Sequence, residues 1–98
     1  MKFTPTIFRG AFIVDPAPFS DVRGTFMRTY CKKEFSNIGF NGEWVQLNHS
    51  ISFKKGTIRG MHYQKSPFGE VKMIKCIKGS ILDVIVDIRR DSATFLQD

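Results

Sequence analysis

The sequence has few of the residues that hold disulfide-rich or thiolate-metal folds together. Only two cysteines, Cys31 and Cys76, occur in 98 residues, far apart and outside any C-x-x-C spacing. This excludes a dense disulfide framework and predicts two free thiols in a reducing compartment. The chain also lacks an apolar run long enough for a membrane span and an apolar signal core near Met1. We therefore expect a cytoplasmic protein.

Basic residues outnumber acidic ones, but the sequence has no long basic run. Fifteen Lys and Arg against nine Asp and Glu give a formal net charge of +6. The basic residues stand singly or in pairs, such as Lys32-Lys33, Lys54-Lys55 and Arg89-Arg90. A solvated basic surface is the simplest interpretation, and cations that point inward to hold a phosphate are the functional one. The basic balance favours an anionic partner, which could be nucleic acid, an acidic membrane or a phosphorylated small molecule.

Short β-branched and aromatic segments alternate with turn residues along the chain. They predict strands over residues 6–14, 25–31, 43–53, 57–64, 70–78 and 81–89. The residues at 15–18 and 21–24 are typical of turns. A short helix is expected over 32–38, ended by Gly39. We therefore predict one all-β domain over residues 1–98, either a sandwich or a barrel.

Two of the predicted strands alternate with period two. In the first, one row of side chains is mostly polar and comprises Trp44, Gln46, Asn48, Ser50 and Ser52. The opposite row comprises Val45, Leu47, His49, Ile51 and Phe53. The polar row could face solvent or line the polar lumen of a small barrel. In the last strand an apolar face is expected from Leu82, Val84, Val86 and Ile88, with Asp83 and Asp87 on the other face.

The stretch from Gly56 to Gln64 is the best candidate for chemistry, because it holds one of only two histidines. Gly56, five residues and then His62 match the start of the metal-binding pattern of cupin barrels. That pattern continues with a second histidine, where this chain has Gln64. His62 with Glu70 alone cannot complete a three-ligand site, so we expect no metal and no other cofactor.

His62 could act as a general base or could be a structural histidine, since no acidic residue beside it in sequence would orient it. Lys72 could stabilise an oxyanion inside a lumen or could lie on an exposed strand face. Strict alternation places Arg59 and His62 on opposite faces of their strand. They could share a site only if the strand is irregular, and Gly60 is the position at which we predict an irregularity.

Five segments in order resemble one known family. They are Asp21–Phe26, Gln46–Ser52, Gly56–Gln64, Val71-Lys72 and Asp83–Arg89. Together they are similar to the N-terminal half of dTDP-4-dehydrorhamnose 3,5-epimerases, from about residue 7 to Phe95. The resemblance implies a metal-free cupin-type jelly roll, of which this chain would form an incomplete, N-terminal portion. It also implies a homodimer whose ligand is a nucleotide-sugar, with neither nucleic acid nor a membrane as partner.

The resemblance implies an isomerase that inverts C3 and C5 of dTDP-4-dehydro-6-deoxyglucose in dTDP-rhamnose biosynthesis. His62 would take the protons next to the C4 ketone, and Lys72 would stabilise the enolate. The nucleotide-sugar would be bound by Arg23, Phe26, Arg28, Gln46, Asn48 and Arg59. The aspartate that partners the histidine and the tyrosine that re-protonates the sugar would belong to the family's later half.

The chain departs from the family pattern at several points. The family usually has a glutamate where this chain has Arg28, and the segment Phe68–Val71 and the residues after Phe95 also differ. The family domain is nearly twice as long, which predicts exposed strand edges here. Alternatives to a 3,5-epimerase are a C3-only epimerase, a non-catalytic module that binds nucleotide-sugars, and a metal-dependent cupin oxygenase.

Overall fold

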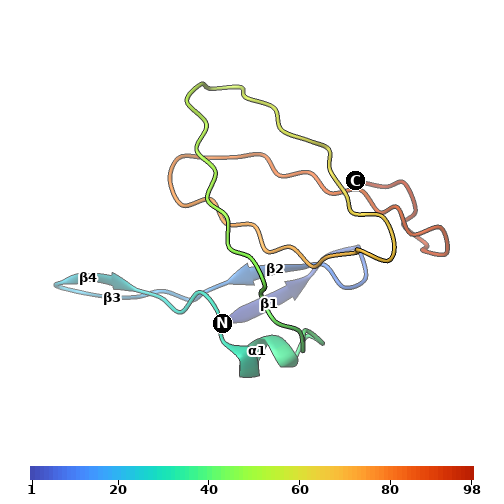
Figure 1. The fold of residues 1–98 in the computed structure, drawn as a ribbon. Coiled ribbons are helices and arrows are strands. Elements are labelled where there is room, and N and C mark those ends of the chain that lie inside the picture. Colours follow the sequence, from blue (N-terminus) through green and yellow to red (C-terminus); the bar gives the residue numbers. More distant parts are fainter. The chain divides into compact units, whose positions relative to one another are not determined.

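The computed structural model describes all residues from Met1 to Asp98, and its regular structure is mainly β, with little helix. It divides into two units, which we describe separately. One unit comprises Met1–Trp44 with Val84–Asp98, and the other comprises Val45–Asp83. All four strands and the single helix belong to the first unit (Figure 1). None of the secondary structure has the length and apolarity of a membrane-spanning helix.

The first sheet pairs β1 (Lys2–Pro5) with β2 (Phe12–Asp15) in antiparallel register, with Lys2 opposite Asp15 and Pro5 opposite Phe12. Between the strands, the Thr6 amide donates to the Ala11 carbonyl at 3.0 Å. The strand predicted over residues 6–14 is therefore wrong in its first part, because residues 6–11 form the hairpin connection. The predicted stop at residues 15–18 is confirmed: β2 ends at Asp15, whose carboxylate accepts the Ala17 amide at 2.8 Å.

The second sheet is a tight hairpin of β3 (Phe19–Asp21) and β4 (Gly24–Phe26). The Asp21 carboxylate accepts the Arg23 amide at 2.9 Å, and Gly24 has φ +136°. The turn predicted at residues 21–24 is thus confirmed, and its cause is local hydrogen bonding by aspartate followed by a glycine. The predicted strand over residues 25–31 is too long, because β4 ends at Phe26.

Helix α1 (Lys32–Ser36) confirms the predicted helix and its glycine end. Gly39 has φ +86°, its amide donates to Ser36 at 3.1 Å, and the Phe40 amide donates to Phe35 at 3.1 Å. These two hydrogen bonds form a Schellman motif, and the rings of Phe35 and Phe40 make the apolar contact that accompanies it, with centroids 6.1 Å apart.

An aromatic cluster around Phe35 is the core of the first unit. Phe35 is the one buried hydrophobic residue, at 4% exposure. Its ring meets Phe3 edge-on at 5.1 Å and lies 5.0 Å from Tyr30, while Phe40 stacks on Trp44 at 4.5 Å. Edge-to-face and offset pairs at these distances are favourable beyond the area that they bury. The cluster joins β1 to α1 and to the residues that follow the helix.

The unit Val45–Asp83 contains no strand or helix, so the strands predicted over 43–53, 57–64 and 70–78 are not formed. The last predicted strand, 81–89, is also absent. The physical reason is pairing, because a strand persists only beside a hydrogen-bonded neighbour. Within this unit a single backbone–backbone hydrogen bond is present, from the Phe68 amide to the Lys65 carbonyl at 2.8 Å.

Candidate functional site

The predicted site residues fall in both units, so each unit is described alone. Arg23, Phe26 and Arg28 belong to the first unit. Arg59, together with Gln46, Asn48, His62 and Lys72, belongs to the unit Val45–Asp83.

Arg23 lies in the β3–β4 turn, where Asp21 fixes the direction of its guanidinium. Nε and Nη2 of Arg23 donate to the Asp21 carboxylate, the latter at 2.6 Å. These hydrogen bonds lower the pKa of Asp21. The Arg23 side chain is still 86% exposed, and its Nη1 makes no hydrogen bond. The turn therefore presents a pre-oriented guanidinium with free donors, which suits an anionic ligand.

Phe26 and Arg28 lie together beside a shallow hollow of about 250 Å³, which Phe19 and Glu34 also line. Phe19 is directly opposite Phe26 in the β3–β4 register, so two aromatic rings share this side of the hairpin. Nη1 of Arg28 donates to Glu34 at 3.1 Å. The structure thus brings two predicted binding residues into one place, with aromatic surface and paired charges.

Glu34 also lines this hollow, although the sequence did not predict it as a site residue. Its carboxylate accepts hydrogen bonds from the Met1 ammonium at 2.7 Å and from Arg28. These two contacts, the ammonium first, lower the pKa of Glu34 to about 2. Its place in the first turn of a short helix gave no sign of the Met1 ammonium, which is 33 residues away in sequence.

In the other unit, His62 lies beside Gly60. A Cβ atom built on Gly60 would stand 3.4 Å from Nδ1 of His62, so the glycine leaves room for the imidazole. Gly60 has φ +111°, a value that side chains other than glycine rarely adopt. The strand that Gly60 was expected to interrupt is absent, so the predicted bulge stays a prediction. No hydrogen bond orients the His62 ring, and none joins it to Arg59.

Lys72 and Arg59 each contact a neighbour within the same unit. Nζ of Lys72 pairs with Glu70 at 2.9 Å, and both side chains are about half exposed. Nη2 of Arg59 donates to the Ile51 carbonyl at 3.3 Å. Gln46 and Asn48 are exposed and make no hydrogen bond. No group of three His, Cys, Asp or Glu side chains lies close enough to hold a metal ion.

The carboxylate of Asp87 accepts hydrogen bonds from Arg89, Ser92 and Thr94, and sequence analysis did not identify this network. Asp87 is 6% exposed. Its carboxylate accepts two hydrogen bonds from the Arg89 guanidinium, from Nε at 2.8 Å and from Nη2 at 2.9 Å. It also accepts one from Thr94 Oγ1 at 2.6 Å and one from Ser92 Oγ. The hydrogen bonds from Arg89, then those from Ser92 and Thr94, hold the pKa of Asp87 far below its usual range.

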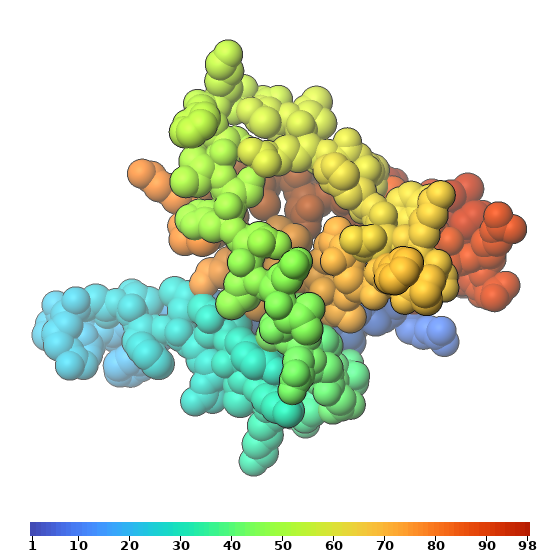
Figure 2. All heavy atoms as spheres, viewed as in Figure 1, coloured from blue at the N-terminus to red at the C-terminus, as the bar shows by residue number.

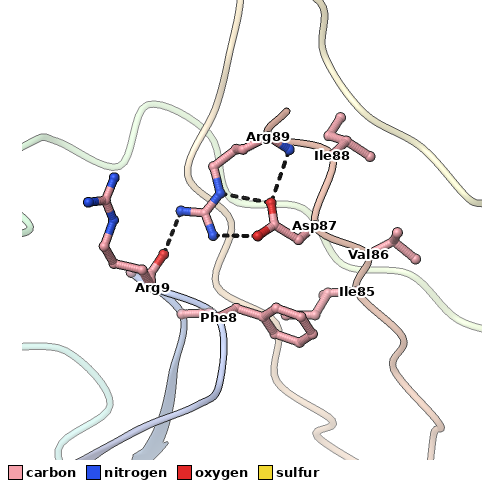
Figure 3. A pocket seen from close by; sticks show the side chains of 9 residues that line it. Phe8, Arg9, Ile85, Val86, Asp87, Ile88 and Arg89 are labelled. Carbon is pink, nitrogen blue, oxygen red and sulfur yellow. Dashed lines mark hydrogen bonds and ion pairs between the residues drawn. The ribbon is translucent and has the colours of Figure 1, made fainter. Parts of the chain in front are cut away.

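The same network joins the N-terminal and C-terminal segments of the first unit. Nη1 of Arg89 donates to the Arg9 carbonyl at 2.7 Å, across the hollow of about 280 Å³ in Figure 3. The expected apolar face of residues 82–88 does not form a buried surface: Leu82 is 91% exposed and Val84 and Ile88 are about half exposed, while Asp87 is buried. The D-x-R spacing was the available signal, because residues two apart on an extended segment share a face.

Comparisons with known proteins identify the chain's relatives. The family model described as dTDP-4-dehydrorhamnose 3,5-epimerase matches residues 5–98. A protein of that name from Shigella flexneri is 42% identical over 96 residues, covering 97% of this chain and 52% of the relative. Another from Methanothermobacter thermautotrophicus is 39% identical, covering 96% of this chain and 50% of its own length. A dTDP-4-dehydrorhamnose 3-epimerase from Streptomyces niveus is 33% identical, covering 97% and 46%.

The chain spans about half the length of the curated relatives that it matches. No solved structure matches it. The matched range includes every residue predicted for the site, from Arg23 to Lys72.

Proposed function

The chain belongs to the dTDP-4-dehydrorhamnose 3,5-epimerase family, and from this premise we propose that it carries the proton-abstracting half of an epimerase site. Its substrate is dTDP-4-dehydro-6-deoxyglucose, and its place is in dTDP-rhamnose biosynthesis in the cytoplasm. The single observation that supports this proposal is the family match over residues 5–98, which contains His62 and Lys72. No metal or other cofactor takes part in the proposed reaction.

The proposed architecture is part of a cupin-type jelly roll that assembles as a homodimer. Short antiparallel strands in the first unit are consistent with a jelly roll. The alternating polar row that includes Gln46 and Asn48 would then line the lumen of the completed barrel.

In the proposed reaction, the ketone at C4 acidifies the hydrogens on C3 and C5. An imidazole nitrogen of His62 takes one of these protons, and the C–H electron pair forms a carbon–carbon double bond to C4. The C4 oxygen becomes an enolate oxygen, which the ammonium of Lys72 stabilises. A proton from water adds to the opposite face of the same carbon and inverts it, the enolate collapses back to the ketone, and the protonated His62 returns its proton to solvent.

Cationic and aromatic side chains would hold the nucleotide-sugar. Arg23 and Arg59 would contact the diphosphate and the sugar, because a guanidinium binds phosphate oxygens in a bidentate fork. The free donors of Arg23 support its role. Phe26 and Arg28 share one hollow with Phe19, which offers aromatic surface to a nucleobase.

Solvent deuterium tests the proposal. The chain is incubated in heavy water with dTDP-4-dehydro-6-deoxyglucose, and deuterium at C3 and C5 is followed by NMR. Loss of a general base is expected to slow exchange by roughly 10²-fold or more in His62→Ala. Loss of the ammonium in Lys72→Met is expected to slow it by roughly 10²-fold. His49→Ala, which removes the other exposed histidine of the same unit, is the matched control and should leave exchange unchanged.

A second candidate is a non-catalytic module that binds nucleotide-sugars. One observation favours it: no hydrogen bond orients the His62 ring, although a base requires an orienting partner. Measurable dTDP binding without deuterium entry would select this module over the epimerase. Deuterium at C3 alone would select the C3-only reaction, which the name of the Streptomyces niveus relative describes.

A further inference from the structure

The hollow of about 250 Å³ beside α1 offers exposed aromatic surface. Phe19 and Phe26 lie directly opposite each other in the β3–β4 register, and they are 67% and 74% exposed. Figure 2 shows this hairpin, light blue at the left of the view, with its side chains in the open. Two neighbouring exposed rings can stack on a planar ligand.

The charged groups of the hollow are one carboxylate and two cations. Oε1 of Glu34 accepts a hydrogen bond from the Met1 ammonium at 2.7 Å, and Oε2 accepts one from Nη1 of Arg28 at 3.1 Å. One negative charge against two positive charges leaves a surplus of one positive charge, which suits an anionic ligand. Each oxygen of the carboxylate already has a cationic donor, so the side-chain groups that remain for a ligand are chiefly N–H donors.

Arg28 keeps most of its donors for a ligand. Neither Nε nor Nη2 makes a hydrogen bond within the chain, while Nη1 is held by Glu34. A long side chain that is free on the surface loses rotamer freedom when it binds a ligand, and this loss weakens binding. The contact with Glu34 orders the guanidinium before the ligand arrives, so less freedom is lost on binding.

Glu34 is well placed to hold Arg28, because the core fixes the helix that carries it. It precedes Phe35, the buried centre of the aromatic cluster, and α1 is followed by the Schellman motif at Gly39. The side chain of Glu34 is 26% exposed, against 62% for Arg28. The more ordered carboxylate therefore orients the more exposed guanidinium.

We infer that Glu34 is a positioning residue for nucleotide binding, and that the Arg28–Glu34 pair determines which nucleobase the hollow prefers. The inference rests on the proposed function, which places the nucleobase in this hollow. Glu34 holds the free N–H groups of Arg28 at the edge of a base that stacks on Phe26. A carbonyl oxygen at that edge accepts from the guanidinium, whereas an amino group there sets one donor against another.

The pair therefore favours thymine over adenine. Thymine presents the carbonyl oxygen O4 where adenine presents the amino group N6. Guanine also has a carbonyl oxygen at the corresponding position, so the pair does not reject it. Stacking on an aromatic ring is similar for every base, so the rings contribute affinity and the guanidinium contributes the preference.

Binding of two nucleotides that differ only in the base tests the inference. dTDP and dADP are titrated separately into the 98-residue chain, and the ratio of their dissociation constants measures the preference. We expect dTDP to bind roughly tenfold more tightly than dADP, which is the effect of one hydrogen bond to a charged group. Equal affinity for the two nucleotides, or no binding of dTDP, would overturn the inference.

Two substitutions separate the roles of the pair. Arg28→Gln replaces the guanidinium by an amide, which has both donors and an acceptor, so the preference for dTDP should disappear. Glu34→Gln keeps the guanidinium but removes the charge that holds it, so the preference should fall by roughly threefold or more. A loss of folding would weaken both nucleotides by the same factor and leave their ratio unchanged. An unchanged ratio in Glu34→Gln would therefore overturn the positioning role.

A double substitution and a matched control complete the test. Because Glu34 acts through Arg28, the variant with both substitutions should have the same ratio as Arg28→Gln alone. A different ratio in the double variant would overturn the positioning role. Lys33→Gln removes a positive charge from an exposed position of the same helix, outside the hollow, and should leave the ratio unchanged. A ratio lowered equally by Lys33→Gln and Arg28→Gln would overturn the assignment to this pair.

The preference is measured without turnover, because neither nucleotide carries a sugar ketone, so it can fail independently of the epimerase proposal. A ratio that depends on Arg28 and Glu34, in a chain that incorporates no deuterium, would retain the preference and reject the reaction. Deuterium incorporation by a chain that binds dTDP and dADP equally would retain the reaction and reject the preference.

Discussion

The two units of the molecule differ in what holds their residues in place. In Met1–Trp44 with Val84–Asp98, strands pair, α1 is capped, aromatic rings pack on Phe35 and a buried carboxylate is fully hydrogen-bonded. In Val45–Asp83, the side chains are exposed and the backbone is almost unpaired. Local order therefore depends on contacts within the first unit.

The residues proposed for the reaction and the residues that stabilise the fold belong to different units. His62, Lys72 and Arg59, on which the proposed reaction depends, all belong to the unit without a core of its own. The residues that stabilise the chain, Phe35 and Asp87, belong to the other unit. Substitutions can therefore affect one property while leaving the other intact, and four predictions use this contrast.

The largest effect is expected from the aromatic core. Phe35→Ala removes the buried ring at the centre of the cluster, which should cost about 3–5 kcal/mol. Small domains have about 5–15 kcal/mol of stability in total, so this single change should remove a large share of it. Urea unfolding followed by Trp44 fluorescence measures the change. Phe53→Ala, at an exposed position, should change stability by less than about 0.5 kcal/mol. Equal effects of the two substitutions would contradict the contrast between the units.

The next largest effect is expected from Asp87→Asn. An amide cannot accept the full set of hydrogen bonds that Arg89, Ser92 and Thr94 now donate, and Arg89 loses its charge partner. The melting temperature should fall by several degrees, and exchange of the Leu96 amide, which donates to the Asp87 carbonyl at 2.7 Å, should accelerate. The matched control is Asp83→Asn, at an exposed position. A melting temperature that is unchanged in Asp87→Asn would show that the network contributes nothing to stability.

A smaller effect should follow from acid titration of Glu34. Its pKa is about 2 in the folded chain against 4.5 for the free group, so the unfolded chain binds a proton first as the pH falls. The stability that Glu34 contributes is therefore fully present above pH 4.5 and lost progressively as the pH falls towards 2. Urea unfolding across this range measures the loss. In Glu34→Gln the free energy of unfolding should depend less steeply on pH. The same slope in both chains would show that Glu34 does not contribute to the loss of stability in acid.

The smallest effect is expected from the ion pair between Lys72 and Glu70. Both side chains are about half exposed, and exposed pairs contribute about 0–1 kcal/mol. Glu70→Gln should therefore leave unfolding by urea within experimental error of the unmodified chain. A clear loss of stability would indicate that Val45–Asp83 has tertiary contacts of its own.

Local features were predictable from sequence because each depends on a few adjacent residues. The stop at Asp15, the turn at residues 21–24 and the helix end at Gly39 are all confirmed. In each case an aspartate side chain or a glycine with positive φ acts on its own neighbours. The positive φ at Gly60 belongs to the same class.

Features that require a distant partner were not predictable in this way. Alternation in residues 43–53 gives the two faces of a strand but not the neighbour that would pair with it. The contact from the Met1 ammonium to Glu34 and that from Arg89 to the Arg9 carbonyl likewise join residues that no local pattern connects. The roles of His62 and Lys72, and of the proposed binding residues Gln46 and Asn48, stay predictions for the same reason.

The hydrogen bond from Arg89 to the Arg9 carbonyl also bears on how the chain is synthesised, because the two residues are 80 positions apart. Closing a flexible loop of that length costs about 4 kcal/mol of entropy. At typical translation rates Arg89 leaves the ribosome roughly 4–16 s after Arg9. Throughout that interval the nascent β1–β2 hairpin lacks this partner, and an isolated hairpin is only marginally stable. The ring of Phe3 can meet Phe35 much earlier, so the aromatic cluster should form first on the growing chain and the Asp87 network last.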